Sequence, residues 1–421
     1  MQGAKPYDID KWTVFEAYRK VKANGGGAGI DGLRMLDYEG NLKNNLYKLW
    51  NRMSSGSYMP KPVKLVDIPK ADGGKRPLGI PTITDRIAQM TAVLLLQPLV
   101  EPYFHEDSYG YRPNRSAHDA IAKAQERCWK YAWVLDLDIS KFFDTIDHEL
   151  LMKAIEKHVK VKWILLYIKR WIEVPYAKSN GEQIKRTMGV PQGSVIGPVL
   201  ANLYLHYVLD KWMTLKYPSV PFERYADDTI YHCSTREKAE ELRSSIKARL
   251  EQCNLKLNEQ KTKVVYCKTS RRKQAHPNIM FDFLGFTFRP RRARDKANGV
   301  SFTSFLPAIS RKSAHKLRME IRAWKLYNFQ QFKLPMIAGM KNPIIAGWVN
   351  YYGKFGRTEF QKVMDYLNQV IACWARKKFK GLRPGRGRSI YWLATVAVEN
   401  RTLFYHWRQG FIPYQKSCQQ G

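Results

Sequence analysis

Apolar residues follow a helical period in some parts of the chain and a strand period in others. A helical pattern covers residues 8–24 and stops at the glycine run 25–27. Further helices are expected at 84–99, 116–128, 148–159, 195–209 and, after a capping box at Ser234 and Glu237, up to about Cys253. Short β-prone runs predict strands at 63–68, 133–138, 222–226, 229–233, 263–266 and 283–288, with a further strand that ends at Pro81. Strands and helices are therefore mixed up to about residue 290.

The composition changes near Pro290, and this change predicts a domain boundary. Beyond it the pattern becomes helical and more basic, and 289–294 (RPRRAR) is expected to be a linker. Residues 310–326 are expected to form a helix in which an apolar stripe lies beside a basic one, made of Arg311, Arg318, Arg322 and Lys325. Asn342 and Pro343 are typical of the start of another helix.

The chain has 421 residues, enough for about two to four packed units. Lys and Arg number 71 against 37 acids, which gives a formal net charge of +34. Such a field attracts polyanions, so nucleic acid is the expected partner. An anionic lipid surface and a merely soluble basic protein are the alternatives, and the charge does not separate RNA from DNA.

The six cysteines are scattered without a CxxC pair, so neither a zinc site nor a disulfide framework is expected. Reduced thiols fit a cytoplasmic protein best. The first residues lack the apolar core of a signal peptide, and no run of about 18 apolar residues predicts a membrane span. We therefore expect a cytoplasmic protein without a membrane partner. The sequence leaves its oligomeric state open.

Residues 374–388 carry seven cations and no acid. A charge run is usually only a solvated surface, although glycine and arginine together also suit a mobile loop that binds phosphates. This run is the best single candidate for contact with an RNA backbone, through Arg376, Lys377, Lys378 and Lys380. The basic stripe of the helix expected at 310–326 is the second candidate.

Three segments carry the chemistry: Val134–Asp144, Gly189–Gly193 and Arg224–Asp228. Nucleotide addition is served by two Mg²⁺ ions roughly 4 Å apart, and Mg²⁺ prefers carboxylate oxygens. Asp138 ends an apolar strand, whereas Asp227 and Asp228 are expected at a tight turn between two strands. Acids held this close repel one another without a cation, which favours a metal. Alone, Tyr-Ala-Asp-Asp would be ordinary turn chemistry, and only the ordered set predicts a polymerase.

The order of these motifs resembles that of bacterial group II intron reverse transcriptases, also called maturases, over nearly the whole chain. The motifs that carry the resemblance are Gly29–Gly32, Ile68–Pro81, Ser108–His118, the Asp138 block, Pro191–Gly193, Tyr225–Asp228, Leu257–Thr262 and Phe283–Phe286. Two departures stand beside them. Residues 194–198 (SVIGP) replace the Gly-x-Leu-Ser-Pro that is frequent in the family, and the tail lacks the Cys/His cluster of an endonuclease domain.

The resemblance implies an α+β fold of the right-hand polymerase type, with fingers and a palm that contains an antiparallel sheet. An all-α thumb, or maturase domain X, and a short basic C-terminal region that resembles a DNA-binding region would follow. The expected divisions are 1–60 for an N-terminal extension, 61–130 for the fingers, 131–295 for the palm with part of the fingers to about 190, 296–365 for the thumb and 366–421 for the C-terminal region. No endonuclease domain is expected.

The resemblance also implies a metal site. Asp138, Asp227 and Asp228 would be the catalytic residues and would ligate two Mg²⁺ ions, for which Mn²⁺ is a substitute. The backbone carbonyl of Ile139 would complete the ligand set.

Contacts with the incoming dNTP are implied in the same way. Lys70 and Arg76 would clamp its triphosphate, Gln192 would contact the nucleotide, and Phe143 would exclude a 2′-hydroxyl. Judged by their pattern alone, Phe143 would be a core residue, and Lys70 and Arg76 would belong to a solvated basic loop.

The implied function is RNA-directed DNA synthesis on an RNA template from a DNA primer, joined to binding of group II intron RNA. That binding would assist splicing and retrohoming into a DNA target. One alternative is an RNA-binding splicing cofactor without polymerase activity, against which the three intact acids argue. The other is a related reverse transcriptase in phage defence or spacer acquisition, and the N-terminal extension and basic tail favour the intron family over it.

Overall fold

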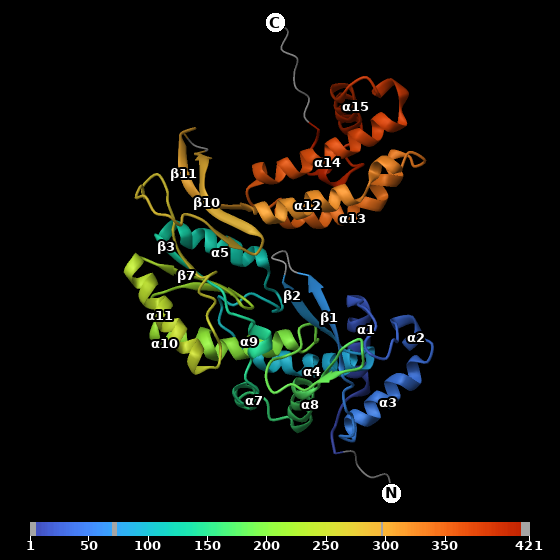
Figure 1. Cartoon of the computed structure of the whole chain (residues 1–421), viewed down its shortest axis with the longest axis vertical. Coiled ribbons are helices and arrows are strands. Elements are labelled where there is room, and N and C mark those ends of the chain that lie inside the picture. Colours follow the sequence, from blue (N-terminus) through green and yellow to red (C-terminus); the bar gives the residue numbers. More distant parts are fainter. Residues whose placement is uncertain (1–5, 70–73, 296–297, 414–421) are drawn as a thin grey trace. The chain divides into compact units, whose positions relative to one another are not determined.

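The computed structural model describes residues 6–69, 74–295 and 298–413 of the chain. These residues divide into two compact units. The first unit contains the described residues up to 120 together with 133–264, and the second contains 121–132 and the described residues from 265 onward. Figure 1 shows the elements of both units. The division at 264 lies upstream of the composition change near Pro290.

Three helices open the first unit: α1 (Lys11–Asn24), α2 (Met35–Glu39) and α3 (Leu42–Ser54). The Asp10 carboxylate accepts the backbone N–H of Thr13 where α1 begins, and α1 ends at Gly25, whose φ of 66° suits glycine. α1 packs on α4 (Ile83–Val100), the apolar helix predicted at 84–99. α4 begins at Ile83 because Thr82 caps it by accepting the N–H of Asp85.

Two four-stranded sheets lie among these helices. One has the order β2-β1-β4-β5, made of Lys75–Ile80, Val63–Pro69, Tyr176–Ala177 and Gln183–Ile184. The other has the order β6-β7-β3-β8, made of Phe222–Tyr225, Asp228–Cys233, Trp133–Leu137 and Lys263–Tyr266. Both β6 and β3 pair antiparallel with β7, as expected for a palm sheet. The boundary between the two units falls within β8.

The remaining helices between residues 101 and 264 are η1 (Glu101–Tyr103), α5 (Ala117–Lys130), α6 (Phe142–Thr145), α7 (His148–Glu156), α8 (Lys162–Glu173), α9 (Gly197–Leu205), the π-helical turn η2 (His206–Asp210), α10 (Lys211–Lys216) and α11 (Arg236–Gln252). The capping box predicted at Ser116 and Asp119 is present, with reciprocal hydrogen bonds of 2.9 and 3.2 Å. The capping box predicted at Ser234 was wrong by one residue, because Thr235 accepts the N–H of Lys238.

The second unit begins with a three-stranded sheet of order β11-β10-β9, made of Ser301–Ile309, Phe286–Arg294 and Phe281–Phe283. The linker predicted at 289–294 was therefore wrong, because RPRRAR is the outer part of strand β10 and pairs with β11. Pro290 is compatible with this strand, since β9 pairs only as far as Phe288 and leaves an open edge beside the proline.

Helices follow the sheet: α12 (Arg311–Ala323), η3 (Leu326–Asn328), α13 (Leu334–Tyr352), α14 (Arg357–Lys378), η4 (Lys380–Leu382), α15 (Arg386–Glu399) and α16 (Tyr405–Arg408). The helix start predicted at Asn342 and Pro343 was wrong, because both residues lie inside α13. The Asn342 amide instead donates to the Leu403 carbonyl and accepts the N–H of Tyr405, so it caps another helix across space. No helix of the described residues is long and apolar enough to cross a membrane.

Aromatic and aliphatic side chains fill the core of the second unit. Phe281 stacks on Phe288 with ring centroids 4.8 Å apart, and Trp324 stacks on Trp348 at 5.3 Å. Trp374 is fully buried and donates its indole N–H to the Phe329 carbonyl. The five described cysteines of the chain are free thiols, and four of them are buried: Cys128, Cys233, Cys253 and Cys267.

Candidate active site

The Tyr-Ala-Asp-Asp segment forms a tight hairpin between β6 and β7. Tyr225 pairs with Asp228, so the two turn residues are Ala226 and Asp227. The expectation that Asp227 and Asp228 both lie in the turn was wrong by one position, since Asp228 is the first residue of β7. Ala226 has a φ of 57°, a left-handed conformation that costs an L-residue about 1–2 kcal/mol. Neighbouring groups must therefore hold this turn in place.

The register of the sheet brings Asp138 to the same hairpin. β3 and β7 pair antiparallel, and their last pair is Leu137 with Thr229. One step further in this register sets Asp138 across from Asp228. The Asp138 carbonyl accepts the N–H of Asn258 at 2.8 Å, so the segment that follows α11 fixes the end of β3. The two aspartate segments, predicted from distant parts of the sequence, therefore meet at one end of the sheet.

The electrostatics of the hairpin agree with this geometry. Burial raises the pKa of the Asp227 carboxyl, and the negative charge of Asp138 raises it further. The Asp227 N–H and the cations of Arg76 and Arg224 lower the same pKa. The pKa of Asp227 therefore responds to the charge of Asp138, and a divalent cation between the two carboxylates would relieve the repulsion.

The carboxylates do not yet converge on one point. The Asp138 carboxylate lies 3.5 Å from the Lys261 ammonium, and its side chain is 41% exposed. Among the described residues, no group of three or more His, Cys, Asp or Glu side chains is arranged to hold a metal ion. The donor chemistry nevertheless fits Mg²⁺, which prefers hard carboxylate oxygens together with water. Ligation would require the Asp138 side chain to turn away from Lys261.

Arg76 and Gln192 meet beside the hairpin although 116 residues separate them. The Arg76 Nε donates to Gln192 Oε1 at 2.6 Å, and the Gln192 Nε2 donates to Asp144 Oδ1 at 3.1 Å. Gly193 has a φ of 104°, and a Cβ there would lie 2.5 Å from the Gly79 carbonyl oxygen, so the Pro-Gln-Gly loop needs its glycine. Asp144 was not predicted to have a role, because its only signal in the sequence is its place in the Asp138 block.

Phe143 and Lys70 complete the set predicted for nucleotide contact. Phe143 is half-buried, its ring packs against that of Phe142 with centroids 5.3 Å apart, and its carbonyl accepts the N–H of Val190. Its ring is thus held on the segment that follows Asp138. Lys70 lies outside the described residues.

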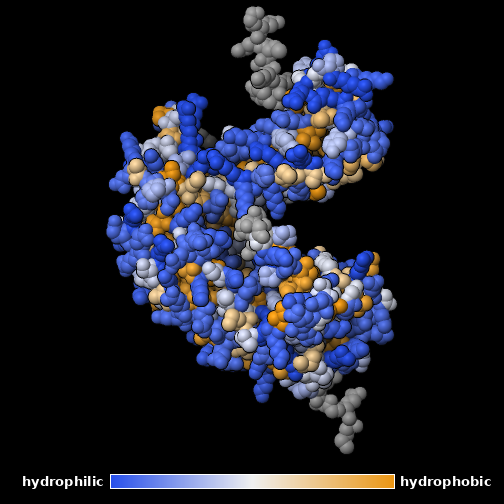
Figure 2. All heavy atoms as spheres, in the orientation of Figure 1, coloured by the Kyte–Doolittle hydropathy of each residue, from blue (hydrophilic) through white to orange (hydrophobic). Residues whose placement is uncertain are grey.

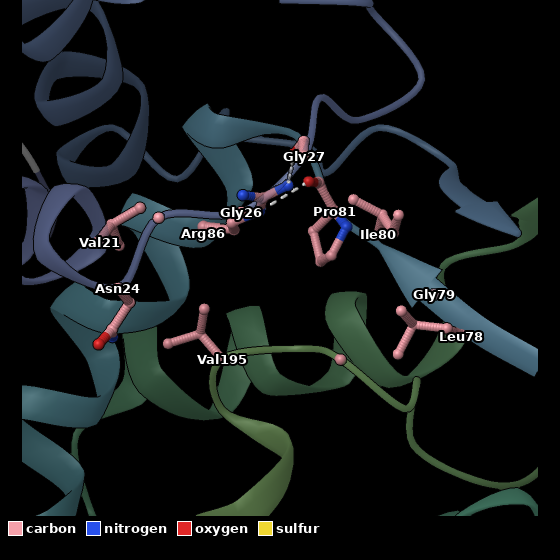
Figure 3. A pocket seen from close by; sticks show the side chains of 12 residues that line it. Val21, Asn24, Gly26, Gly27, Leu78, Gly79, Ile80, Pro81, Arg86 and Val195 are labelled. Atoms are coloured by element: carbon pink, nitrogen blue, oxygen red, sulfur yellow. Dashed lines mark hydrogen bonds between the residues drawn. The ribbon is translucent and has the colours of Figure 1, made fainter. Parts of the chain in front are cut away.

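A pocket of about 280 Å³ adjoins Gln192 on the side of the N-terminal helices. Its walls come from the end of α1, the glycine run 25–27, the end of β2 and the loop 193–195 (Figure 3). The Arg86 guanidinium closes one side by donating to the carbonyls of Gly27 and Pro81. Apolar side chains, glycine backbone and the Arg86 guanidinium therefore line this pocket.

The basic residues predicted to contact RNA lie in the second unit. In α12, Leu317 and Ile321 are buried, whereas Arg318 is half-buried and Arg311 and Arg322 are exposed. Lys325 is also exposed, but it lies beyond the end of α12 with a φ of 47°. Hydrophilic residues cover most of the face around α15 in Figure 2.

The run 374–388 is mostly helical, so the mobile loop expected there was wrong. Its first five residues end α14 and its last three begin α15. Lys377 and Lys380 are exposed and Arg376 is half-buried. The Lys378 ammonium donates to the Gln330 and Phe332 carbonyls at 2.5 and 2.8 Å, so it already serves the fold.

Two parts of the chain match known protein families. Residues 68–288, more than half of the chain, match the family described as reverse transcriptase (RNA-dependent DNA polymerase). The chain belongs to the reverse transcriptases. Residues 314–392 match the group II intron maturase-specific domain, so the polymerase is joined to a maturase domain in one polypeptide. The predicted fold class, enzyme class and function, RNA-directed DNA synthesis with assistance to intron splicing, are confirmed.

Several curated proteins are similar to this chain. Protein YkfC of Escherichia coli (strain K12) is 31% identical over 303 residues, which cover 63% of this chain and 77% of YkfC. Group II intron-encoded protein LtrA of Lactococcus lactis subsp. cremoris is 34% identical over 200 residues, which cover 47% of this chain and 33% of LtrA. A telomerase structure from Candida albicans aligns with 89% of this chain and 67% of its own at a TM-score of 0.47 and 13% identity. The chain thus spans about a third of LtrA.

Proposed function

We propose that this reverse transcriptase extends a DNA primer on an RNA template with Asp138, Asp227 and Asp228 as its catalytic residues. The observation that carries the proposal is the register of β3 with β7, which aligns Asp138 with the Asp227–Asp228 hairpin. The Arg76 guanidinium hydrogen bonds to the Gln192 amide, and its positive charge acts on Asp227.

In this proposal the three carboxylates hold two Mg²⁺ ions, with the Ile139 carbonyl as a further ligand and Mn²⁺ as a substitute ion. Two such ions, when bound, stabilise both the attacking 3′-oxygen and the leaving diphosphate oxygens. Asp138 would leave its contact with Lys261, which is exposed and only 3.5 Å away. Strand β7 and the tight turn would keep Asp228 and Asp227 aimed at the same point.

The incoming dNTP would lie against the hairpin of β1 and β2. Arg76 would exchange its hydrogen bond with Gln192 for one with the triphosphate, to which a guanidinium is well suited. Lys70 would add a second cation to the triphosphate. Gln192 would contact the nucleotide, and the half-buried ring of Phe143 would exclude a 2′-hydroxyl from the sugar site.

The second unit would bind group II intron RNA and thereby assist splicing and retrohoming into a DNA target. Exposed cations on α12 and at the end of α14 support this role, because phosphate contacts need accessible positive charge. We keep the divisions at 60, 130, 295 and 365 as functional regions, with β10 and β11 in place of the expected linker. Buried free thiols support a reducing compartment such as the cytoplasm.

The test of the site is the double substitution Asp227→Ala with Asp228→Ala. We expect loss of all primer extension on an RNA template with Mg²⁺, and unchanged RNA binding, because the basic residues proposed to contact RNA lie in the second unit. A matched control is Glu237→Ala with Glu241→Ala, which removes two exposed carboxylates from α11. Extension retained by the aspartate double variant would refute the site. A parent protein that binds intron RNA without any extension would favour the splicing cofactor.

A further inference from the structure

One arginine beside the catalytic hairpin is completely buried and has no role in the function proposed above. Arg224 lies in β6, two residues before Ala226, and its side chain has no exposed surface. Its Nε and Nη2 donate to the two oxygens of Asp210 at 2.7 and 2.5 Å. Asp210 is equally buried and ends the π-helical turn η2. This ion pair fixes the guanidinium in one orientation.

The remaining nitrogen of that guanidinium serves the turn. The Nη1 of Arg224 donates to Asn202 Oδ1 at 3.0 Å and to the Ala226 carbonyl oxygen at 3.2 Å. The Ala226 carbonyl belongs to the planar peptide that joins Ala226 to Asp227. A donor that fixes this oxygen therefore also fixes the plane from which the Asp227 backbone and side chain emerge.

A second chain segment closes the network on the other side of the turn. Asn202 donates through Nδ2 to the Gly110 carbonyl at 2.6 Å. The backbone of Gly110 lies so close to the turn that a Cβ there would be 2.5 Å from the Ala226 nitrogen. Ala226 is thus held between Arg224 and Gly110. Such support is what a non-glycine residue with a positive φ requires.

We propose that Arg224 is a positioning residue of the polymerase site, which holds the Ala226 carbonyl and thereby aims the Asp227 carboxylate at the catalytic metal. The proposal rests on the function proposed above, since the aim of Asp227 matters only if Asp227 is a ligand. Stability alone does not explain the network, because a buried ion pair is often no more stabilising than an apolar pair of similar volume.

The decisive variant replaces the buried pair by apolar residues: Asp210→Leu with Arg224→Met. It leaves the net charge unchanged and avoids an unpaired buried charge, so the fold should survive. The first measurement is Mn²⁺ binding by electron paramagnetic resonance, with RNA template, a dideoxy-terminated primer and the matching dNTP present. We expect the Mn²⁺ dissociation constant to rise about 10- to 100-fold, the usual effect of losing a group that orients a metal ligand. Primer extension should fall by a similar factor and recover in part at high Mg²⁺.

The single variant Arg224→Met separates positioning from simple electrostatics. Removal of a cation near Asp227 should strengthen binding of a divalent cation if charge alone mattered. If Arg224 positions Asp227, the affinity for the cation should change in the opposite direction, so Mn²⁺ should bind more weakly. Arg224→Lys keeps the charge but replaces the planar fork by a single ammonium, so it should also weaken Mn²⁺ binding.

Two further variants keep the test decisive. Asn202→Ala leaves the ion pair of Arg224 and Asp210 intact, and it replaces the apolar double variant as the test if that variant does not fold. We expect it to raise the Mn²⁺ dissociation constant by a smaller factor. Tyr58→Phe is the matched control, because it removes a buried 2.5 Å hydrogen bond to Asp85 away from the turn. It should lower the melting temperature and leave Mn²⁺ binding unchanged.

The two proposals fail in different ways. A parent protein without primer extension at any metal concentration would remove the proposed site and this inference together. A parent protein that extends the primer would be consistent with the proposed site. In that case, a folded Arg224 variant, or Asn202→Ala, that binds Mn²⁺ as the parent does would overturn the role of Arg224 alone.

Discussion

Charged side chains are buried inside the first unit, whereas no Asp, Glu, Lys or Arg is buried among the described residues of the second. The first unit buries Asp85, Arg86, Asp107, Asp210, Glu223 and Arg224. The core of the second consists of aromatic and aliphatic side chains, joined by a few neutral polar groups such as Asn368 and His406. Desolvating a charge costs several kcal/mol unless a partner compensates, so burial of charge needs a reason.

The difference agrees with the role proposed for each unit. Polymerisation requires carboxylates held within a fraction of an ångström, and charged hydrogen bonds in a buried network supply direction as well as energy. Binding of an RNA backbone requires positive charge at the surface with less exact geometry, because counterion release depends mainly on the number of phosphates contacted. The second unit can therefore place its cations outside an apolar core. The predictions below test this contrast.

The largest effect is expected at Gly110. A Cβ there would meet the Ala226 nitrogen at 2.5 Å and the Tyr225 carbonyl carbon at 3.0 Å, so Gly110→Ala must displace the hairpin. We expect primer extension to fall by about 100-fold or more, since a shift of about 1 Å at a catalytic group has this effect. Gly347→Ala in α13 is the control, because its Cβ would meet nothing within 4 Å. Steady-state primer extension assays measure the activity of both variants. Near-parental activity of Gly110→Ala would contradict the view that the first unit needs an exactly placed hairpin.

A smaller effect is expected on RNA affinity when exposed cations of the second unit are removed. Parent affinity should fall by about 10³-fold between 50 and 200 mM salt if roughly six phosphates are contacted. The triple substitution of Lys377, Lys380 and Arg383 by alanine should weaken RNA binding and flatten the plot of log affinity against log salt by about 0.7 to 0.9 per lost contact.

Extension of a pre-annealed primer at low salt should change little in this triple variant. A triple substitution of the exposed residues Lys20, Lys43 and Lys48 removes the same charge from the N-terminal helices and serves as its control. Equal losses of RNA affinity in both variants would mean that total charge matters rather than this surface. Filter binding at four or more salt concentrations gives the slopes.

The smallest effect concerns stability alone. Burial lowers the pKa of His406 to about 3, and its Nε2 hydrogen bonds to Asn368 Oδ1 at 2.9 Å. The unfolded histidine takes up a proton near its ordinary pKa of 6.5, whereas the folded one does so only far below it. The stability contributed by this site is therefore fully present above pH 6.5 and is lost as the pH falls toward 3, by at most about 1.4 kcal/mol per pH unit.

His406→Gln should remove this part of the pH dependence without affecting primer extension. The expected result is a smaller drop in the free energy of unfolding between pH 7 and pH 5 than in the parent, measured by urea titration. Parallel changes in the two proteins would show that His406 is protonated in the folded state.

Much of the local structure could be predicted from the sequence. The helices at 8–24 and 84–99, the capping box at Ser116 and the two strands around Tyr-Ala-Asp-Asp were all identified within one to three residues. Apolar period, capping chemistry and turn residues act over a few positions, so they can be detected in a single chain. The strand predicted at 283–288 contains the start of β10, but the outer part of β10 at 289–294 was missed because its arginines hide the alternation of apolar and polar positions.

In the candidate site, too, some residues could be predicted from sequence motifs and others could not. The three aspartates were proposed from ordered motifs, and Arg76 and Gln192 were proposed singly from the family resemblance, yet Arg224 and Asp210 received no role. A single arginine before Tyr-Ala-Asp-Asp carries no periodic signal, and its partner lies 14 positions away on another element. Asn342 has the chemistry of a cap, but the group it caps lies about 60 residues further along the chain.

The amino-acid sequence alone therefore determined the order of the elements, the basic charge and the presence of a reverse transcriptase with a maturase domain, because each depends on residue types and short spacings. Only the tertiary structure decided that Asp138 faces the hairpin, that Arg224 supports its turn and that Lys378 serves the fold rather than solvent. These contacts join residues far apart in the chain, and strand register and the burial of polar groups select them.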